Sequence, residues 1–372
     1  ESRGAMGIKQ STLENLAMIL KRPSKDFWCE KRVLVTGHTG FKGMWLSLCL
    51  HRLGAKVSGI SLAPDSSPNL YNLIDFQNIG ESILCDIRDL KKLSDQFQTV
   101  DPEFVFHMAA QPLVRKSYLH PVDTFSSNIT GTVHVLECMR TLLSLKAAVM
   151  ITTDKVYQDH KIKKPYIESA PLGGNDPYSS SKAACEIVIN SYRKSYFEEL
   201  CIPVASARAG NVIGGGDWSE DRLIPDAIRA WEKQETLRIR RPNATRPWQH
   251  VLEPLHGYLM LAQQISSDQE KAQAYNFGPD IDATASVREV ITIANNFFGE
   301  GEVEFDDSVE GPHESEWLSL DTSKSQKELG FIPQWSLSET IQHSVSWYKD
   351  LQKGEDALTL CNQQIALYNK AS

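Results

Sequence analysis

The sequence predicts an α/β fold, in which a doubly wound parallel sheet carries a smaller, discontinuous α/β lobe. Three observations lead to this prediction. Short apolar runs alternate with helical stretches, a pattern typical of parallel strands because each strand needs a crossover connection. A glycine-rich turn follows the first apolar run. After Ala209 the chain becomes rich in glycine, proline and tryptophan, and this change of composition indicates a separate, irregular lobe.

The alternation begins at Lys31 and fixes the expected order of elements. We expect strands at 32–36, 56–62, 82–85, 104–108, 147–152 and 203–208, and helices at 42–53, 122–144 and 178–199. A short amphipathic pattern at 8–25 ends near Pro23 and predicts a further helix outside the main fold.

The second lobe is predicted to be built from two separate stretches of chain. A helix is expected near 224–234, after which 249–278 return as strand, helix (254–265) and strand (274–277) to complete the sheet. Helices at 286–298 and 336–349 belong to the lobe again. The expected boundaries are 26–210 and 249–278 for the sheet domain, 211–248 and 279–372 for the lobe, and 1–25 for an N-terminal extension. Ligands of such sheets bind at the carboxyl ends of the strands, so the lobe should close over that edge.

Composition favours a small-molecule partner. The 372 residues carry a net charge of −8 without long runs of one sign, which argues against nucleic acid or an anionic membrane. No apolar run approaches the roughly 20 residues that a membrane-spanning helix needs. The seven cysteines are odd in number and lack C-x-x-C spacing, so we expect reduced thiols in a cytoplasmic protein and no metal site.

The glycine turn is the first candidate for function. Gly37, Gly40 and Gly43 follow the strand at 32–36 in a G-x-x-G-x-x-G pattern. Such spacing lets the backbone turn tightly and approach a pyrophosphate, whose charge is met by N–H groups at the helix N-terminus. An ordinary strand-to-helix turn has the same local pattern, so the dinucleotide prediction depends on the surrounding alternation.

Two groups of polar residues are candidates for catalysis. Thr153, Asp154 and Lys155 follow the strand at 147–152, although polar residues also end strands without any function. Tyr178 and Lys182 lie four residues apart on one helix face, where a plain exposed face is the alternative. We predict that the Lys182 ammonium lowers the pKa of Tyr178 from about 10 towards working pH, as a general base acting on a sugar hydroxyl requires.

Together these features resemble the extended short-chain dehydrogenase/reductase family between about Lys31 and Trp347. The resemblance rests on the segments 36–43, 86–87, 107–111, 128–132 and 211–214, with Thr153, Tyr178 and Lys182. It implies a Rossmann fold that binds NAD, and five catalytic residues: Thr153, Asp154, Lys155, Tyr178 and Lys182. It also implies cofactor contacts by Gly37, Thr39, Gly40, Phe41, Lys42, Gly43, Ser61, Asp86, Ile87, Ala109, Ala110, Gln111, Asn128, Tyr178 and Lys182.

The same resemblance implies a homodimer, with a dimer of dimers as the alternative. The helices at 122–144 and 178–199 are expected to pair. The second helix carries a stripe of small and apolar residues suited to close packing: Ala183, Ala184, Ile187, Val188 and Ser191. A core face turned towards the sheet is the other interpretation of this stripe.

Within the family, Asp154-Lys155 and the segments 214–225 and 245–254 resemble the CDP-glucose branch of the nucleotide-sugar 4,6-dehydratases. The resemblance implies a redox-neutral lyase that oxidises C4 of CDP-glucose, removes water across C5–C6 and returns the hydride to C6. Its product would be a precursor of deoxysugars in surface polysaccharides such as lipopolysaccharide. Asp154, held neutral in a dry site, is expected to protonate O6. Lys155 is expected either to take the C5 proton or to stabilise the enolate.

Three other functions stay open on the sequence alone. Another nucleotide-sugar 4,6-dehydratase and a nucleotide-sugar epimerase or reductase use the same scaffold. A non-catalytic nucleotide-binding regulator is the third, and the intact Thr153, Tyr178 and Lys182 count against it because a binder does not need them.

The implied substrate contacts include several arginines, for each of which a charged lobe surface is the alternative. They are Asn211, Arg222, Leu223, Ile224, Arg238, Arg240, Arg246 and His313. Related dehydratases carry Arg-Pro-Gly-His where this chain has Glu310-Gly-Pro-His313, so His313 or another basic group must replace an arginine. The strand ending at Ser61 lacks the usual acid for an adenosine ribose, which leaves Ser61 or Asp65 for that role and favours NAD over NADP only weakly.

Overall fold

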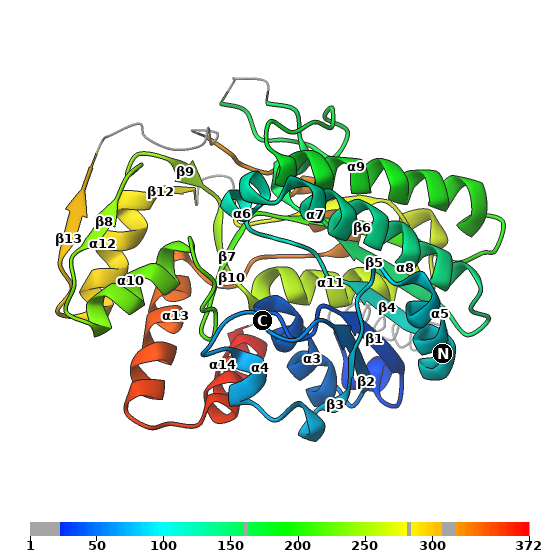
Figure 1. The fold of residues 1–372 in the computed structure, drawn as a ribbon, viewed down its shortest axis with the longest axis horizontal. Coiled ribbons are helices and arrows are strands. Elements are labelled where there is room, and N and C mark those ends of the chain that lie inside the picture. Colours follow the sequence, from blue (N-terminus) through cyan, green and yellow to red (C-terminus); the bar gives the residue numbers. More distant parts are fainter. Residues whose placement is uncertain (1–22, 160–162, 281–283, 307–316, 372) are drawn as a thin grey trace, which may run out of the picture.

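The computed structural model describes residues 23–159, 163–280, 284–306 and 317–371. At its centre is a seven-stranded parallel sheet in the order β11-β6-β5-β4-β1-β2-β3 (Figure 1). The strands are β1 (Arg32–Thr36), β2 (Lys56–Ser61), β3 (Gly80–Leu84), β4 (Phe104–His107), β5 (Ala147–Ile151), β6 (Val204–Ala209) and β11 (Ala274–Phe277). The strand order runs outwards in both directions from β1 and β4, which confirms the predicted doubly wound sheet.

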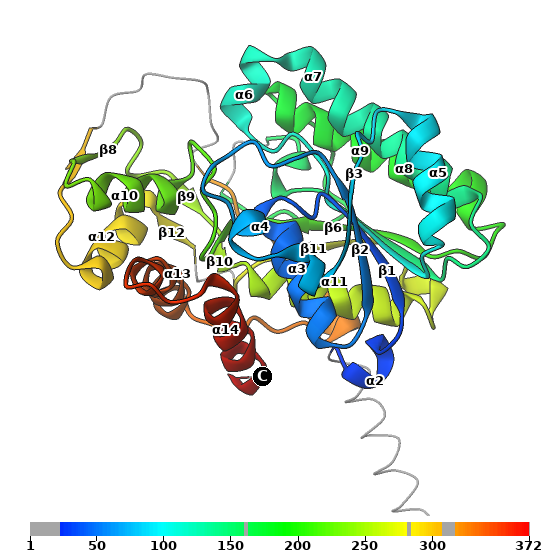
Figure 2. The same ribbon diagram turned by 60° about the horizontal axis from the view of Figure 1, so that its bottom comes forward.

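Helices cover both faces of this sheet (Figure 2). On one face lie α3 (Phe41–Arg52) and α11 (Leu252–Ile265), and on the other α5 (Leu90–Val100), α8 (Gly131–Arg140) and α9 (Pro177–Tyr192). The central strands β4, β5 and β6 are buried along their whole length because helices exclude water from both sides.

Some helices differ from the sequence-based expectation. The sequence patterns did not predict α5. The helix expected at 122–144 consists of α7 (Pro121–Phe125), a π-helical turn at Ser126–Thr130 and α8, which ends at Arg140. The helix expected at 178–199 ends as α9 at Tyr192 and continues as a second π-helical turn at Arg193–Phe197.

The lobe is assembled from short strand pairs and helices. These are β7 (Asn211–Ile213) with β10 (Trp248–His250), β8 (Leu237–Ile239) with β13 (Val303–Phe305), and β9 (Thr245–Arg246) with β12 (Ala285–Ser286), together with α10 (Leu223–Glu232), α12 (Val287–Phe298) and α13 (Leu337–Gln352). The expectation that a strand near 249 joins the main sheet is wrong. The edge next to β6 is occupied by β11, so β10 pairs with β7 instead.

Both ends of the described chain pack near α3 and the sheet. The final helix α14 (Ala357–Ala371), which the sequence patterns did not predict, contacts α13, α3 and α4 (Leu70–Leu73). At the other end, α2 (Lys25–Trp28) buries Trp28. Most of the helix expected at 8–25 lies outside the described residues. No helix within the described ranges is long and apolar enough to cross a membrane.

Candidate active site

The glycine turn connects β1 to α3 with very little room for side chains. Gly37 has a φ of +80°, and a Cβ there would lie 2.8 Å from the backbone nitrogen of Ala109. A Cβ on Gly43 would lie 2.1 Å from the carbonyl oxygen of Gly37. Gly40 precedes α3 and offers no side-chain cap, so the first N–H groups of the helix stay available to an anion. The turn therefore suits a pyrophosphate, as the sequence predicts.

The segment after β4 is fastened to this turn. The backbone N–H groups of Met108 and Ala109 donate to Thr36 Oγ1 at 3.1 and 3.2 Å, and this oxygen lies 2.7 Å from His107 Nδ1. Burial, with the nearby Lys182 charge, lowers the pKa of His107 to about 3, so His107 is neutral. Ala109, Ala110 and Gln111 of this segment are half-buried beside the turn.

Asn128 joins the same segment to the helices above the sheet. Its Oδ1 accepts from the Gln111 backbone N–H at 2.8 Å, and its Nδ2 donates to the Gln111 carbonyl at 3.1 Å and to Ser181 Oγ at 2.8 Å. Asn128 lies in the π-helical turn between α7 and α8. Such turns are frequent at functional sites because they redirect side chains that a regular helix would carry elsewhere.

The predicted adenosine contacts lie at the ends of β2 and β3. Thr39 Oγ1 donates to the Leu62 carbonyl at 2.9 Å and lies 2.8 Å from Ser61 Oγ. Asp86 accepts hydrogen bonds from Arg88, which lower the pKa of its carboxyl, and the neighbouring Ile87 is buried. Of the two groups proposed for the ribose, Ser61 is buried beside Thr39, whereas the exposed Asp65 pairs with Lys116 at 3.2 Å.

The carboxyl edge of β5 presents a buried acid. Thr153 Oγ1 donates to Asp154 Oδ1 at 3.0 Å, and the side chain of Asp154 is 1% exposed. The other oxygen, Asp154 Oδ2, has no hydrogen-bond partner among the described residues. Burial raises the pKa of Asp154, although the charges of Lys155 and Arg246 and the Thr153 bond oppose the shift. The structure thus places a carboxyl group that favours its neutral form beside Lys155.

The helix α9 begins with Asp176, whose carboxylate accepts the Ser179 N–H at 2.9 Å, followed by Pro177. It places Tyr178 and Lys182 on its buried face. The expected lowering of the Tyr178 pKa is wrong for this structure: burial raises it to about 12, against the influence of Arg222 and a hydrogen bond with Thr153. The Lys182 ammonium instead donates to the Ile151 carbonyl at 3.2 Å.

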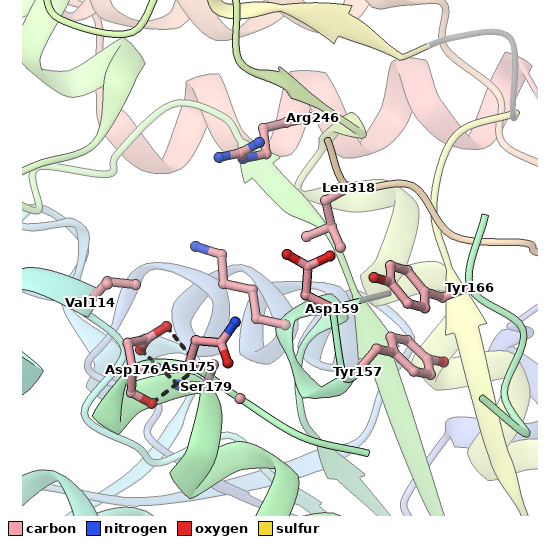
Figure 3. Close-up of a pocket in the computed structure, with 11 residues that line it drawn as sticks. Val114, Tyr157, Asp159, Tyr166, Asn175, Asp176, Ser179, Arg246 and Leu318 are labelled. Atoms are coloured by element: carbon pink, nitrogen blue, oxygen red, sulfur yellow. Dashed lines mark hydrogen bonds between the residues drawn. The ribbon is translucent and has the colours of Figure 1, made fainter. Parts of the chain in front are cut away.

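Three basic residues, Lys42, Arg222 and Arg246, lie around Asp154 and Tyr178. The half-buried Lys42 donates to Tyr258 OH at 3.0 Å, and burial, with the charges of Lys182 and Arg222, lowers its pKa to about 7. Arg222 immediately precedes α10, and its Nη2 reaches the Pro112 carbonyl at 3.5 Å. Arg246 is buried in β9. Lys155 and Arg246 border a pocket with Tyr157, Asp159, Asn175, Asp176 and Ser179, into which Arg246 reaches from the lobe (Figure 3).

The remaining predicted substrate contacts do not all lie near the catalytic residues. Asn211 is the first residue of β7, and Leu223 and Ile224 are the first two residues of α10. Both elements lie at the boundary between lobe and sheet. Arg238 on β8 and Arg240 directly after that strand are both exposed. Arg238 pairs with Glu304 at 3.1 Å, and no described contact joins either arginine to Asp154 or Tyr178. His313 lies outside the described residues.

A closely packed glycine turn, a β4 end hydrogen-bonded to that turn and a helix with Tyr178 and Lys182 on a doubly wound sheet define the class, an extended short-chain dehydrogenase/reductase. Comparison with known proteins gives the particular family. A family model described as GDP-mannose 4,6 dehydratase matches residues 34–344, and the chain belongs to this family.

Individual relatives narrow the similarity further. The chain is 44% identical over 354 residues to CDP-glucose 4,6-dehydratase from Salmonella typhimurium, covering 94% of this chain and 99% of the relative. It is 26% identical to the dTDP-D-glucose 4,6-dehydratase of Bos taurus over 86% of this chain and 89% of the relative.

Solved structures share the fold. UDP-glucose 4-epimerase from Thermotoga maritima superposes with a TM-score of 0.74 at 22% identity, covering 86% of this chain and 99% of the other. dTDP-glucose 4,6-dehydratase from Bacillus anthracis, in complex with NAD, superposes with a TM-score of 0.72 at 21% identity, covering 88% and 99%.

Proposed function

We propose that the protein is an NAD-dependent CDP-glucose 4,6-dehydratase, a hydro-lyase. The 44% identity to a CDP-glucose 4,6-dehydratase over nearly the whole of both chains supports the substrate. The observation that carries the chemistry is Asp154, a buried carboxyl with a raised pKa and one oxygen without a partner, next to Lys155 and close to Tyr178. An epimerase has no need of an acid that protonates a leaving hydroxyl.

The residues at the edge of the sheet fit NAD. Gly37 and Gly43 leave no room for a Cβ where the backbone turns, and the open helix end supplies N–H groups for the pyrophosphate. Ser61, Asp86 and Ile87 hold the adenosine end, and Lys42, Asn128 and Lys182 lie towards the other end. When bound, NAD supplies the hydride acceptor for C4 and the hydride donor for C6.

Each catalytic side chain then has one task. Tyr178 takes the proton from the C4 hydroxyl of the sugar, and Thr153 binds this sugar hydroxyl. Lys182 and Arg222 are the cations near Tyr178. After C4 oxidation the C5 proton becomes acidic. Asp154 donates its proton to O6, which leaves as water. Lys155 either removes the C5 proton or, as a cation, stabilises the enolate while a water molecule takes that proton, and a proton returns to C5 when the hydride is delivered to C6.

The lobe supplies the substrate contacts. Arg222 and Arg246 both lie close enough to influence the catalytic group, and they are suited to bind the diphosphate. Asn211, Leu223 and Ile224 line the boundary, and Arg238 and Arg240 contact the nucleotide where it extends along β8. His313 stays a predicted contact. We assign 26–210 and 249–278 to the cofactor domain and 211–248 and 279–372 to the substrate lobe, except that β10 as a whole pairs with β7 of the lobe.

We further propose a homodimer in the cytoplasm, whose product serves deoxysugar and surface polysaccharide synthesis. Apolar side chains are exposed along α6 (Val114–Leu119), α7 and α9, among them Leu119 at 75%, Val122 at 79% and Ile187 at 61%. A patch of this kind is typical of a subunit interface. All seven cysteines are free, which suits a reducing compartment.

A panel of nucleotide sugars tests the substrate. We expect CDP-glucose to give a 4-keto product that is lighter by one water, without consumption of free NADH. An isomer of unchanged mass indicates an epimerase. Faster dehydration of dTDP-, UDP- or GDP-sugars contradicts the assignment of the base.

A further inference from the structure

A buried ion pair lies beneath the catalytic residues. Arg208 of β6 donates from Nε to Glu186 Oε1 at 3.0 Å and from Nη2 to Glu186 Oε2 at 2.8 Å, and both side chains are about 5% exposed or less. Glu186 follows Lys182 by four residues, so it extends the buried face of α9 that carries Tyr178. The two parallel hydrogen bonds fix the relative orientation of the pair.

The ion pair reaches both ends of the segment 152–157, which contains Asp154 and Lys155. At the near end, Thr152 Oγ1 donates to Glu186 Oε1. At the far end, Arg208 Nη1 donates to Tyr157 OH at 2.9 Å. The segment is therefore hydrogen-bonded to the ion pair at both ends, through Thr152, which precedes Thr153, and through Tyr157, which follows Lys155 by two residues.

Tyr157 is held on its remaining sides as well. Its hydroxyl donates to Asn276 Oδ1 at 2.6 Å, and its ring stacks on Tyr166 with a centroid distance of 4.9 Å and an interplanar angle of 7°. Burial raises the pKa of Tyr157, which keeps the hydroxyl available as a donor. Tyr157 and Tyr166 lie side by side at one end of the pocket that Lys155 and Arg246 border (Figure 3).

A role in stability alone is the competing explanation, because a buried ion pair also costs desolvation energy. The connections favour a more specific role. The Glu186 carboxylate accepts from Thr152, from Ser206 Oγ at 2.8 Å and twice from Arg208, and although burial opposes it, these partners lower its pKa. Because the Glu186 carboxylate is fully hydrogen-bonded, it is held in one position and can fix the position of the segment 152–157.

We propose that the Glu186–Arg208 pair positions the segment 152–157 for the loss of water across C5–C6. In this role the two members of the pair and Tyr157 act through Asp154 and Lys155. The inference rests on the proposed function. It predicts that disturbing the far end of the segment slows elimination more than C4 oxidation.

Tyr157→Phe is the sharpest variant, since it removes one hydroxyl and leaves the ion pair intact. Removing Glu186 or Arg208 leaves an unpaired buried charge and endangers the fold. Tyr275→Phe is the matched control, because Tyr275 is also buried and donates its hydroxyl to a side-chain oxygen, Glu328 Oε2 at 2.8 Å, which lies outside the segment. Arg208→Lys keeps the charge and loses the planar fork that serves Glu186 and Tyr157 together.

The experiment is a single turnover of the NAD-loaded enzyme with CDP-glucose, followed by the absorbance of reduced nicotinamide and by product mass. For Tyr157→Phe and Arg208→Lys we expect accumulation of reduced nicotinamide and product formation slowed by about 10-fold or more, since small misplacements of catalytic groups are costly. KM should stay within about 2-fold of wild type. Tyr275→Phe should match wild type in both readouts.

Two results overturn the inference. One is slower product formation without accumulation of reduced nicotinamide, which signals a general loss of active enzyme. The other is Tyr157→Phe behaving like Tyr275→Phe. If the wild-type enzyme yields no dehydrated product from CDP-glucose, the proposed function itself fails, and the inference fails with it.

Discussion

Replacing Asp154 by Asn separates elimination from oxidation. The amide has the shape of the carboxyl group but cannot donate a proton to O6 and remain stable as its anion. Loss of a general acid slows the step that it serves by about 100- to 10,000-fold. At about 1.4 kcal/mol per tenfold, the elimination barrier should therefore rise by about 3–5 kcal/mol. The barrier to C4 oxidation should change little.

The structure indicates that this substitution spares the fold. Asp154 is buried and burial raises its pKa, so the neutral amide avoids the desolvation cost that the charged carboxylate carries at this position. The hydrogen bond from Thr153 Oγ1 reaches Oδ1, an atom that asparagine keeps. Oδ2, which asparagine replaces by an NH₂ group, has no described partner to lose. The melting temperature should accordingly stay within about 2 °C of wild type.

The assay is a stopped-flow single turnover with CDP-glucose. Asp154→Asn should form bound NADH at nearly the wild-type rate and then stall, with little dehydrated product. Asp159→Asn is the control, because Asp159 lines the pocket that Lys155 borders and lies five residues further along the chain. Absence of NADH would refute the reasoning, since Asp154 would then act before elimination. Wild-type turnover would refute it equally, because another group would supply the proton.

Three further predictions concern the same site, and a fourth concerns the proposed subunit interface. Tyr178→Phe should abolish C4 oxidation while NAD still binds in a titration, and near-native turnover would remove Tyr178 as the base. Lys155→Met should allow C4 oxidation but slow exchange of the C5 hydrogen with solvent deuterium by about 100-fold or more; unchanged exchange would leave Lys155 a positioning role only. Because burial raises the Asp154 pKa, the acid keeps its proton above the ordinary carboxyl range, so elimination should fall as pH rises through that pKa, and Asp154→Asn should lose this limb of the profile. Finally, light scattering should give a dimer mass that Ile187→Glu reduces to that of the monomer, whereas a wild-type monomer at micromolar concentration would contradict the interface.

Local patterns predicted most of the framework. The strand, turn and helix around Gly37 and the position of Asp154 after β5 depend on residues close together in sequence, and both are found where they were expected. The two-faced sheet follows from the alternation of strands and helices, because parallel strands allow few other arrangements. Pairing in the lobe was harder to predict, since strands of two or three residues carry too little pattern to choose between β7 and the main sheet.

Properties that depend on tertiary burial could not be obtained from spacing. The four-residue interval to Lys182 suggested a lowered Tyr178 pKa, but desolvation outweighs nearby cations and raises it. The Glu186–Arg208 pair joins residues on a helix and a strand, and only the fold shows that they meet. The sequence does contain one indication of this pair. Glu186 follows Lys182 by four residues and so lies on the same helix face as Tyr178 and Lys182, where a buried carboxylate needs a positively charged partner.

The fate of the hydrogen at C4 tests the central claim most directly. CDP-glucose deuterated at C4 is converted by the NAD-loaded enzyme in ordinary water, and the product is analysed by NMR and mass spectrometry. We expect a 4-keto-6-deoxy product in which the deuterium has moved to C6, with no reduced cofactor released. Deuterium that returns to C4 of an epimerised sugar, or that leaves in free NADH, would contradict the claim of a redox-neutral dehydration.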